Sequence, residues 1–517
     1  MLAFLLALLL VAGSVQLTLR SPGLPAWLLS KRMLLLAGTI IVLVLWAGTY
    51  ALFDNYPLTR DEQMVLFDTQ VFRSLQLAAP VPQEWRSFLS ALNPAFLLAL
   101  PDNAAWVSSY MPMNGMLRAA FGTVADPALM NPLLAGLGAF ALFDVTGRLF
   151  PEDQKAQLLA LLLYATSTQI LVTAMTTYAM TAHLALNLIW LCLYLRGTWR
   201  GHALALCVGF VAIGLHQIVF HPLFALPFIN RLRQQRQWRA ALVYVGAYAI
   251  FGLFWISYPQ IVASSAGLSG GAAATAAPGS FLAERVLPLL KDREPQTIPL
   301  MVANLLRFVA WQNLALIPLM GLGVRAVRRD EGIARPLAYG VGFTFVAMAI
   351  LLPYQGHGWG YRYLHGLIGN CILLALYGWR ELRIVEQRRA FVWAGTLATF
   401  VSMPFLMWQA HAFAHPYARV NRAIDRINVD MVVVETDGPE FRIDEVRNRP
   451  DLLNRPIRLA SSALNDGDIQ SLCERGTIAF LDAKQMRALG QGFGPARVSP
   501  QFRSLQVVAK KSRCRLL

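Results

Sequence analysis

The chain has 517 residues, of which 56% are hydrophobic and only 14% are charged. A soluble domain carries about 25% charged residues, so this composition excludes an ordinary water-soluble enzyme and an intrinsically disordered chain. The formal net charge of +16 does not indicate nucleic-acid binding, because the basic residues cluster in short loops between apolar segments, as in multi-span membrane proteins.

About twelve apolar segments are predicted to span the membrane, since a spanning helix needs roughly 20 mostly apolar residues. The pair at 203–230 is ambiguous because each half is short and is interrupted by histidine or proline. The first segment lacks a basic start and a cleavage site, so we expect it to remain as an anchor. The segments lie near 1–19, 33–53, 128–147, 156–173, 178–195, 203–217, 218–230, 240–258, 300–322, 337–354, 363–379 and 391–409.

Basic residues occupy alternate loops between these segments, and with twelve spans all of these loops fall on one side. The positive-inside rule assigns that side to the cytoplasm. The opposite side then receives the loops 54–127 and 259–299 and the chain from about residue 410. We therefore expect a multi-pass protein of the inner (plasma) membrane. The basic clusters are Arg20, Lys31 and Arg32; Arg231, Arg233, Arg236 and Arg239; Arg325, Arg328, Arg329 and Arg335; and Arg380, Arg383, Arg388 and Arg389.

Residues 410–517 are predicted to form a small extracytoplasmic α/β domain that follows a transmembrane domain at 1–409. Helical patterns alternate with three β-like runs, Met431–Glu435, Ile457–Ala460 and Thr477–Leu481, which is typical of such a domain. This region contains Cys473 and Cys514, which could form a disulfide outside the cytoplasm.

The loop 54–127 is long for a connection between membrane spans, and it carries the adjacent acids Asp61 and Glu62 near its start. Thr59 and Glu62 match the capping box of a helix N-terminus, so Glu62 can act as a cap. Asp61 is not needed for that box, and the helix dipole favours its ionised form, which could accept a proton from a nucleophile. A solvated acid in a first helical turn is the simpler alternative. The rest of the loop is amphipathic, as in helices that lie in the membrane interface.

A second polar cluster lies on the same predicted side, where Gly356, Gly358 and Gly360 precede Arg362. Glycine lets the backbone approach a ligand closely, and the guanidinium group suits a phosphate. An aromatic belt with one snorkelling arginine is the alternative, but it does not require three glycines.

Histidines occur at several predicted helix ends, and most are simply explained as hydrogen-bonded interfacial residues. Polar groups at membrane depth are costly and are often functional, so His216 and His221 are candidate phosphate ligands. His411 and His415 have the spacing of a zinc pair on a helix, but no glutamate is placed for metalloprotease chemistry. We predict no metal site and no other cofactor, although a divalent metal is left open.

Four motifs in this order resemble those of the GT-C class of membrane glycosyltransferases, which includes protein O-mannosyltransferases and lipid A aminoarabinose transferases. The resemblance covers most of the chain from about residue 50, and it implies a mainly α, polytopic transmembrane helical bundle. Met111 and Met113 depart from the proline-glycine spacing of the class, and His365 stands where members often have a proline-rich stretch. The motifs are Asp61-Glu62, Trp106–Gly115, Tyr178–His183 and Gly358–Leu364.

The resemblance implies inverting transfer of a sugar from a polyprenyl-phosphate donor to an extracytoplasmic lipid, glycan or protein acceptor at the bilayer. Asp61 would be the catalytic base, with Glu62 as the fallback. Arg362 would bind the donor phosphate, with weaker candidates in His357, His216 and His221. The motif residues that would line the substrate cleft are Tyr110, Tyr178, His183, Trp359 and Tyr361.

Three alternative functions are considered. A transporter or lipid flippase would show inverted repeats and ionisable residues at the membrane midplane, and few such residues occur here. An O-antigen ligase would have its long loop late in the chain, whereas this loop follows the second span. A structural scaffold would leave the glycine-rich loop at Arg362 without a role.

Overall fold

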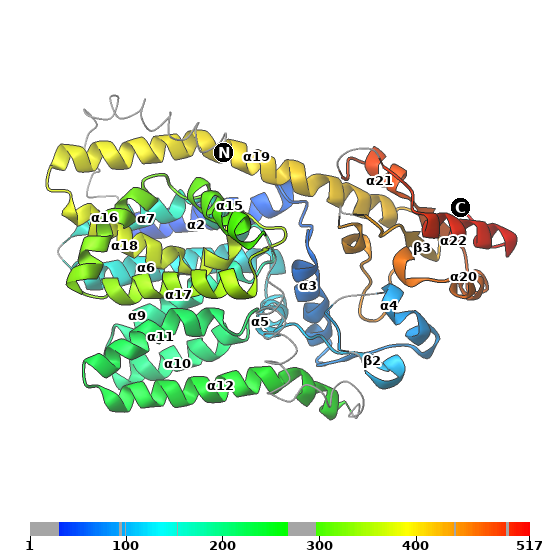
Figure 1. Ribbon diagram of the computed structural model, residues 1–517, viewed down its shortest axis with the longest axis horizontal. Coiled ribbons are helices and arrows are strands. Elements are labelled where there is room, and N and C mark those ends of the chain that lie inside the picture. The colour runs from blue at the N-terminus through cyan, green and yellow to red at the C-terminus, as the bar shows by residue number, and fades with distance from the viewer. Residues whose placement is uncertain are drawn as a thin grey trace. The chain divides into compact units, whose positions relative to one another are not determined.

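The computed structural model describes residues 30–92, 96–98, 100–151, 153–266, 296–438, 441–492 and 496–517. Over these ranges the chain is mainly helical, with a small parallel sheet in its C-terminal part (Figure 1). It divides into two compact units. The bundle unit comprises the described parts of Met1–Ala51, Ala125–Ile256 and Pro278–Ala410, and the α/β unit those of Leu52–Val124, Ser257–Ala277 and His411–Leu517.

The helices of the bundle unit are connected mostly by short turns, and several begin at a side-chain cap. Asp153, Ser167 and Thr198 each accept a hydrogen bond from a backbone N–H of the first turn that follows. Two helices, α12 and α19, contribute residues to both units. The helices are α2 (Lys31–Ala51), α6 (Met130–Leu149), α7 (Gln154–Ala165), α8 (Thr168–Ala174), α9 (Met180–Tyr194), α10 (Trp199–Ile213), α11 (Phe220–Gln234), α12 (Trp238–Ser265), α15 (Thr297–Ala310), α16 (Leu316–Arg329), α17 (Ala334–Leu351), α18 (Ile368–Glu381) and α19 (Val385–Asp425).

Among the described residues, 5 helices are long and apolar enough to cross a membrane, and the pair α7 and α8, bent by 57°, would make a sixth. The chain is therefore a multi-pass membrane protein. The prediction of about twelve spans is confirmed only in part, because helices such as α9, α10 and α11 have 15 residues each. The span predicted at 1–19 and most of the loop at 259–299 lie outside the described residues.

The single span predicted at 300–322 is wrong, because the chain breaks between α15 and α16. At the break, the Asn313 amide donates hydrogen bonds to the hydroxyls of Thr166 and Thr396 at 2.8 and 3.2 Å. The backbone N–H of Leu314 donates to the Thr399 hydroxyl at 3.0 Å. Side chains from α19 and from the end of α7 thus bond the Asn313 amide and one backbone N–H that the break leaves without an intrahelical partner.

Helix α18 lies at the centre of the bundle core, and all of its residues from Ile368 to Trp379 are buried. It packs closely on α16 because glycines face each other at the contact. A Cβ atom on Gly378 would overlap the carbonyl oxygen of Leu319, and one on Gly323 would overlap that of Leu374. Only glycine allows the two backbones to approach this closely.

The α/β unit contains a three-stranded parallel sheet in the order β4-β3-β5, with Met431 paired with both Ile457 and Ile478. All three β-like runs predicted in the C-terminal region are thereby confirmed as strands. Helices also occur in the first loop, but their location in the membrane interface stays a prediction. The elements are α3 (Arg60–Arg73), β1 (Ala79–Pro80), η2 (Gln83–Phe88), α4 (Leu89–Leu92), η3 (Pro101–Asn103), β2 (Ala105–Trp106), α5 (Met113–Phe121), β3 (Met431–Val434), η8 (Arg442–Glu445), β4 (Ile457–Ala460), α20 (Asp466–Cys473), β5 (Ile478–Leu481), α21 (Ala483–Ala488) and α22 (Pro500–Lys511).

One hydrophobic cluster joins the first loop to the C-terminal segment. Met64, Phe67 and Trp106 belong to the same cluster as Val433 and Leu459 of the sheet. Residues 52–124 therefore fold in one unit with the C-terminal segment, whereas the sequence groups them with the transmembrane domain at 1–409. This packing places the acids at the start of α3 on the same folding unit as the sheet.

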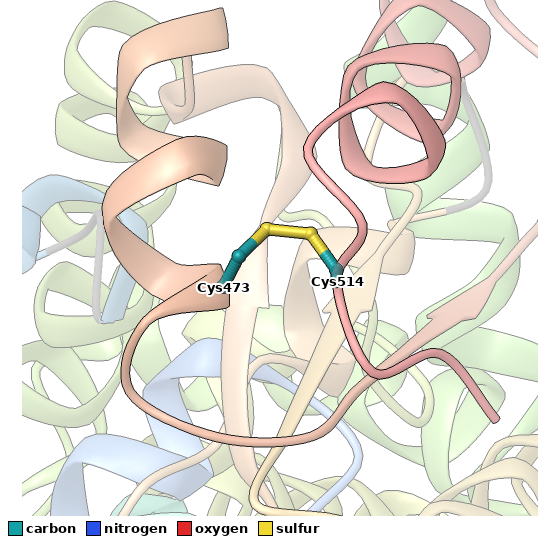
Figure 2. Close-up of a disulfide and its surroundings, with 2 residues drawn as sticks. All are labelled: Cys473 and Cys514. Carbon is teal, nitrogen blue, oxygen red and sulfur yellow. A yellow bond between two sulfur atoms is a disulfide. The ribbon is translucent and has the colours of Figure 1, made fainter.

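A disulfide joins Cys473, at the end of α20, to Cys514, on the segment that follows α22 (Figure 2). The two Cα atoms are 4.8 Å apart, within the range that the bond requires. Cys192, Cys207 and Cys371 are free. The bond that the sequence left open is present, and it closes the end of the chain onto the α/β unit.

Candidate active site

The two adjacent acids at the start of α3 have different surroundings. The Glu62 carboxylate accepts hydrogen bonds from the backbone N–H groups of Leu58 and Thr59 at 3.1 and 3.4 Å, and the residue is 2% exposed. Glu62 is therefore a helix cap, as the spacing predicts. Asp61 is only half-buried, so it is the more accessible of the two acids.

Arg60 anchors the start of α3 to the C-terminal part of the same unit. Its guanidinium donates to the carbonyl oxygens of Ile443 and Val446 at 2.6 and 3.2 Å, and it lies 3.6 Å from the Asp444 carboxylate. Burial lowers the pKa of Arg60 to about 10 despite the opposing charge of Asp444, so the group stays cationic at neutral pH. The neighbouring Asp61 is thus held on a firmly fixed helix end.

Two further acids next to this helix end were not found from the sequence. Burial raises the pKa of Asp444, with a contribution from the charge of Asp61. Burial also raises the pKa of Glu445 to about 7, and its carboxylate accepts a hydrogen bond from the Tyr56 hydroxyl at 3.1 Å. These acids follow about 380 residues after α3 in a segment with no distinctive motif, so only the fold reveals them.

In the bundle unit, hydrogen bonds and glycine geometry hold the loop that carries Arg362. The Gln355 side chain accepts a hydrogen bond from the backbone N–H of Arg362 at 3.0 Å and donates one to the carbonyl oxygen of Gly360 at 2.9 Å. Gly356 and Gly360 adopt φ values of 65° and 66°, which favour glycine. Two of the three glycines in the motif are therefore explained by backbone conformation.

Aromatic rings surround the Arg362 guanidinium. It lies 5.7 Å from the ring centroid of Tyr178 and 5.1 Å from that of Tyr363, whose hydroxyl accepts a hydrogen bond from it at 3.3 Å. The Tyr178 hydroxyl donates to the backbone carbonyl of His357 at 3.3 Å. Burial, with help from the charge of Arg362, lowers the pKa of His357 to about 4. His357 is therefore neutral at pH 7, which leaves Arg362 as the cation at this place.

A small cavity of about 10 Å³ lies beside Arg362, with room for about one water molecule. A phosphate group would enter only if side chains moved. His183 is buried with no hydrogen-bond partner at either ring nitrogen among the described residues, and the Thr344 hydroxyl likewise has none. Such buried polar groups are costly unless a ligand or water satisfies them. The lining residues are Met180, His183, Asn187, Phe220, Thr344, Arg362, Tyr363, Gly366 and Leu367.

The other two candidate histidines differ in their environment. The ring of His216 stacks on Phe220, which lines the cavity, with centroids 6.0 Å apart. His221 is fully buried, and its ring nitrogens form hydrogen bonds with Asn187 and with the Tyr248 hydroxyl, both at 2.7 Å. The prediction of His221 as a phosphate ligand is corrected here, because both of its nitrogens are used in the core.

The remaining predicted cleft residues have different local surroundings. Trp359 packs against Trp311 with ring centroids 6.1 Å apart, and Tyr361 is fully buried in the bundle core. Tyr110 packs against Phe96 in the α/β unit, 5.7 Å between centroids. Tyr361 is thus buried in the core, while Tyr178 and His183 lie next to Arg362. A substrate cleft lined by these residues stays a prediction.

The histidine pair on α19 has a structural role. The His411 ring is hydrogen-bonded to the carbonyl oxygen of Leu52 at 2.8 Å, and that of His415 to the Asp54 carboxylate at 2.7 Å. These bonds anchor the segment that follows α2. In the described part of the chain, no group of three or more His, Cys, Asp and Glu residues is arranged to hold a metal ion.

No known sequence family and no curated protein matches the chain. Among solved structures, ArnT from Cupriavidus metallidurans bound to undecaprenyl phosphate aligns with a TM-score of 0.55 at 12% identity, over 81% of this chain and 86% of that one. The apo form of the same protein aligns with a TM-score of 0.51 at 12% identity, over 80% and 84% of the two chains. The chain has a GT-C-like fold.

A further match to this GT-C-like chain is the arabinofuranosyltransferase AftD from Mycobacteria, at 15% identity and a TM-score of 0.45, over 83% of this chain and 32% of that one. At these identities the likeness concerns the fold alone. The likeness to ArnT confirms the GT-C type of fold that the sequence motifs imply. The roles of individual residues in the GT-C-like fold remain predictions.

Proposed function

We propose that the chain is a membrane glycosyltransferase that moves a sugar from a polyprenyl-phosphate donor to an acceptor at the bilayer surface. The observation that carries this proposal is the likeness in fold to ArnT, whose structure contains undecaprenyl phosphate. The surroundings of Arg362 add chemical support, because a fixed guanidinium beside a buried histidine and threonine suits a phosphate group.

The proposed reaction is a direct displacement at the anomeric carbon. Asp61 takes the proton of the acceptor hydroxyl while the acceptor oxygen bonds to that carbon. The bond from the same carbon to the phosphate oxygen breaks, and the polyprenyl phosphate leaves with the electron pair. Arg362 stabilises the charge that develops on the leaving phosphate, since preorganised cations contribute strongly to such steps. The configuration at the anomeric carbon inverts.

The reaction is proposed to occur on the extracytoplasmic side of the inner membrane. The Cys473–Cys514 disulfide supports an oxidising compartment for the α/β unit. The last turns of α11 and α16 are rich in arginine, which supports a cytoplasmic location for these ends of the two helices. The acceptor is a lipid, a glycan or a protein. Mass spectrometry of the envelope after deletion of the gene distinguishes these classes, because the acceptor then lacks one sugar.

Asp61→Asn tests the base. With the donor and acceptor so identified, we expect kcat to fall about 1000-fold in this variant, because the amide cannot accept the proton. Thermal shift by undecaprenyl phosphate should stay within two-fold of that of the unaltered protein, which separates catalysis from folding. Glu84→Gln, an exposed acid in the same unit, is the matched control and should keep full activity. Full activity of Asp61→Asn would remove Asp61 as the base.

Arg362→Gln tests the phosphate site. We expect its affinity for undecaprenyl phosphate to fall at least about ten-fold, because a charge-assisted contact is lost. Arg200→Gln, an exposed arginine on α10 of the same unit, controls for the change in net charge. An unchanged donor affinity in Arg362→Gln would contradict the assignment of the phosphate to this loop.

A further inference from the structure

A second and much larger cavity lies within the α/β unit. Its volume is about 260 Å³, and a water molecule needs only roughly 10–15 Å³ of such space. It therefore has room for a ligand the size of a single sugar ring. Its walls come from α3 and from the segment between Val446 and Arg458, and none of the residues proposed for sugar transfer lines it.

The cavity is lined by four arginines and a single carboxylate. Arg458 is paired with that carboxylate, Asp425, at 2.5 Å, and Arg449 is paired with Asp451 at 2.6 Å. Arg60 is held by two backbone carbonyls and lies 3.6 Å from the Asp444 carboxylate. Three of the four arginines thus pair with a carboxylate, and two of those carboxylates, Asp444 and Asp451, lie outside the lining. The side chains that line the cavity itself are four cations and one anion, a set that suits an anionic ligand.

Arg447 has hydrogen-bonding capacity that its contacts within the described residues do not use. Its Nε atom donates to the carbonyl oxygen of Asp444 at 2.7 Å, and its guanidinium lies 3.9 Å from the ring centroid of Tyr56. Its Nη2 atom is buried and has no hydrogen-bond partner among the described residues. The stacking on Tyr56 restricts the Arg447 guanidinium. The side chain therefore loses little further rotamer freedom when it binds an oxyanion.

Gln63 provides a hydrogen-bond acceptor, whereas Arg447 provides donors. This residue is 8% exposed and lines the cavity, and its Nε2 atom donates to the carbonyl oxygen of Asp444 at 2.7 Å. Its Oε1 atom is buried and has no hydrogen-bond partner among the described residues. A fully deprotonated oxyanion cannot satisfy this oxygen, whereas a hydroxyl group can. Phe67 and Met64 add an apolar wall suited to the C–H face of a ring.

We propose that this cavity binds an anionic sugar unit, that is, a hydroxylated ring that carries one carboxylate or phosphate group. Because Arg447 Nη2 and Gln63 Oε1 are buried, the two side chains turn toward the cavity when the ligand enters. The acid group then contacts Arg447, and a ring hydroxyl donates to Gln63. Arg362 is not among the residues that line this cavity, and the proposal does not depend on the transfer reaction. It is tested by binding alone, so its failure and the failure of the transferase proposal are distinguishable.

The binding test uses the full chain in detergent, titrated with glucuronate, glucose 6-phosphate, glucose and inorganic phosphate and followed by saturation-transfer NMR. We expect glucuronate or glucose 6-phosphate to bind at least ten-fold more tightly than glucose, and the tighter of the two anions identifies the acid group. Equal binding of glucose, or no binding of either anionic sugar, would overturn the proposal. Inorganic phosphate that binds as tightly as the better anionic sugar would also overturn it, since the ring would then contribute nothing.

Charge changes at Gln70 locate the binding. Gln70 is exposed and lines the cavity, so its substitution should leave the packing of the core unchanged. We expect Gln70→Glu to weaken binding of the anionic sugar about three-fold and Gln70→Lys to strengthen it about three-fold, as for single charges near a surface. Binding unaffected by both changes would place the ligand elsewhere and overturn the assignment.

Arg447→Gln tests the central contact, with an expected loss of at least ten-fold in affinity for the anionic sugar. Arg503→Gln, an exposed arginine on α22 of the same unit, is the charge-matched control and should bind as the unaltered protein does. If Arg447→Gln misfolds, the opposite effects of the two Gln70 variants decide the question. Retained affinity in a folded Arg447→Gln variant would contradict the proposal.

Discussion

Asp68 lies on the buried side of α3, and burial raises its pKa to about 8, although a hydrogen bond with Ser108 acts in the opposite direction. In the unfolded chain this carboxyl group ionises near its usual pKa of about 4. The folded state therefore keeps the proton over a pH range in which the unfolded state has lost it. The stability that this group contributes is greatest below pH 4 and declines as the pH rises from about 4 to about 8.

Asp68→Asn should make unfolding less dependent on pH, since the amide resembles the protonated acid and does not titrate. Between pH 5 and 7 the slope of the unfolding free energy should become less negative by about 1.4 kcal/mol per pH unit. Thermal unfolding in detergent over this range measures the effect. Glu474→Gln, at an exposed acid of the same unit, should leave the slope unchanged, and an unchanged slope in Asp68→Asn would show that Asp68 is ionised in the folded protein.

Glu62 allows capping to be separated from catalysis. Glu62→Gln keeps a carbonyl oxygen that can accept from the backbone of Leu58 and Thr59, whereas Glu62→Ala removes it. We expect Glu62→Ala to lose about 1 kcal/mol of stability and Glu62→Gln to lose much less. Sugar transfer should persist in Glu62→Gln. Loss of transfer in this variant with unchanged thermal stability would instead make Glu62 the catalytic base.

Residue roles could be predicted where a local pattern determines them. The spacing of Thr59 and Glu62 predicts a cap because the partners lie within one turn. The role of His221 was missed because its partners, Asn187 and Tyr248, are on other helices. Asp444 was missed for the same reason, because its contact with Arg60 of α3 joins residues that are far apart along the chain.

At the scale of elements, the contact of α16 with α18 is the most sensitive to substitution. Gly378→Ala would place a methyl group on the carbonyl oxygen of Leu319, and neither backbone can yield without separating the helices. We expect this variant to fail to accumulate as a monodisperse protein in size-exclusion chromatography. Gly321→Ala, on the partner helix α16 but with open space around the position, should accumulate normally. Normal behaviour of Gly378→Ala would show that the helices lie farther apart.

Hydropathy predicted most helices of the bundle unit but missed the break in the segment 300–322. Apolar residues lie on both sides of Asn313, so the average hydropathy hardly changes there. The hydroxyls of Thr166, Thr396 and Thr399 satisfy the polar groups at the break, and they come from distant parts of the chain. Breaks of this kind depend on long-range hydrogen bonds, which a sequence window does not contain.

For the whole molecule, the side of the membrane on which the α/β unit lies can be tested chemically. We expect a cysteine at Gln83→Cys, an exposed position of this unit, to react with a membrane-impermeant maleimide in intact cells. A cysteine at Gln235→Cys, exposed after α11, should react only after lysis. Both are introduced into a background that lacks the free cysteines Cys192, Cys207 and Cys371. The reverse labelling pattern would invert the proposed topology.

The grouping of residues 52–124 with the C-terminal segment could not be predicted from the sequence. Each segment alone has a plausible pattern, amphipathic helices in one and alternating strands in the other. What joins them is the shared cluster that includes Phe67 and Val433, which are far apart along the chain. Composition could identify a membrane protein with a polar tail, but not that the first loop completes the core of that tail.

The burial of α18 from Ile368 to Trp379 has a consequence for the order of assembly during synthesis. This helix packs against α7, α9, α16 and α17, which all leave the ribosome before it does. Until Ile368–Glu381 has been inserted, these earlier helices enclose an unfilled space that lipid must occupy. Nascent chains that stop before α18 should therefore be degraded readily by proteases. Chains that include α18 should have a closed core and resist proteolysis.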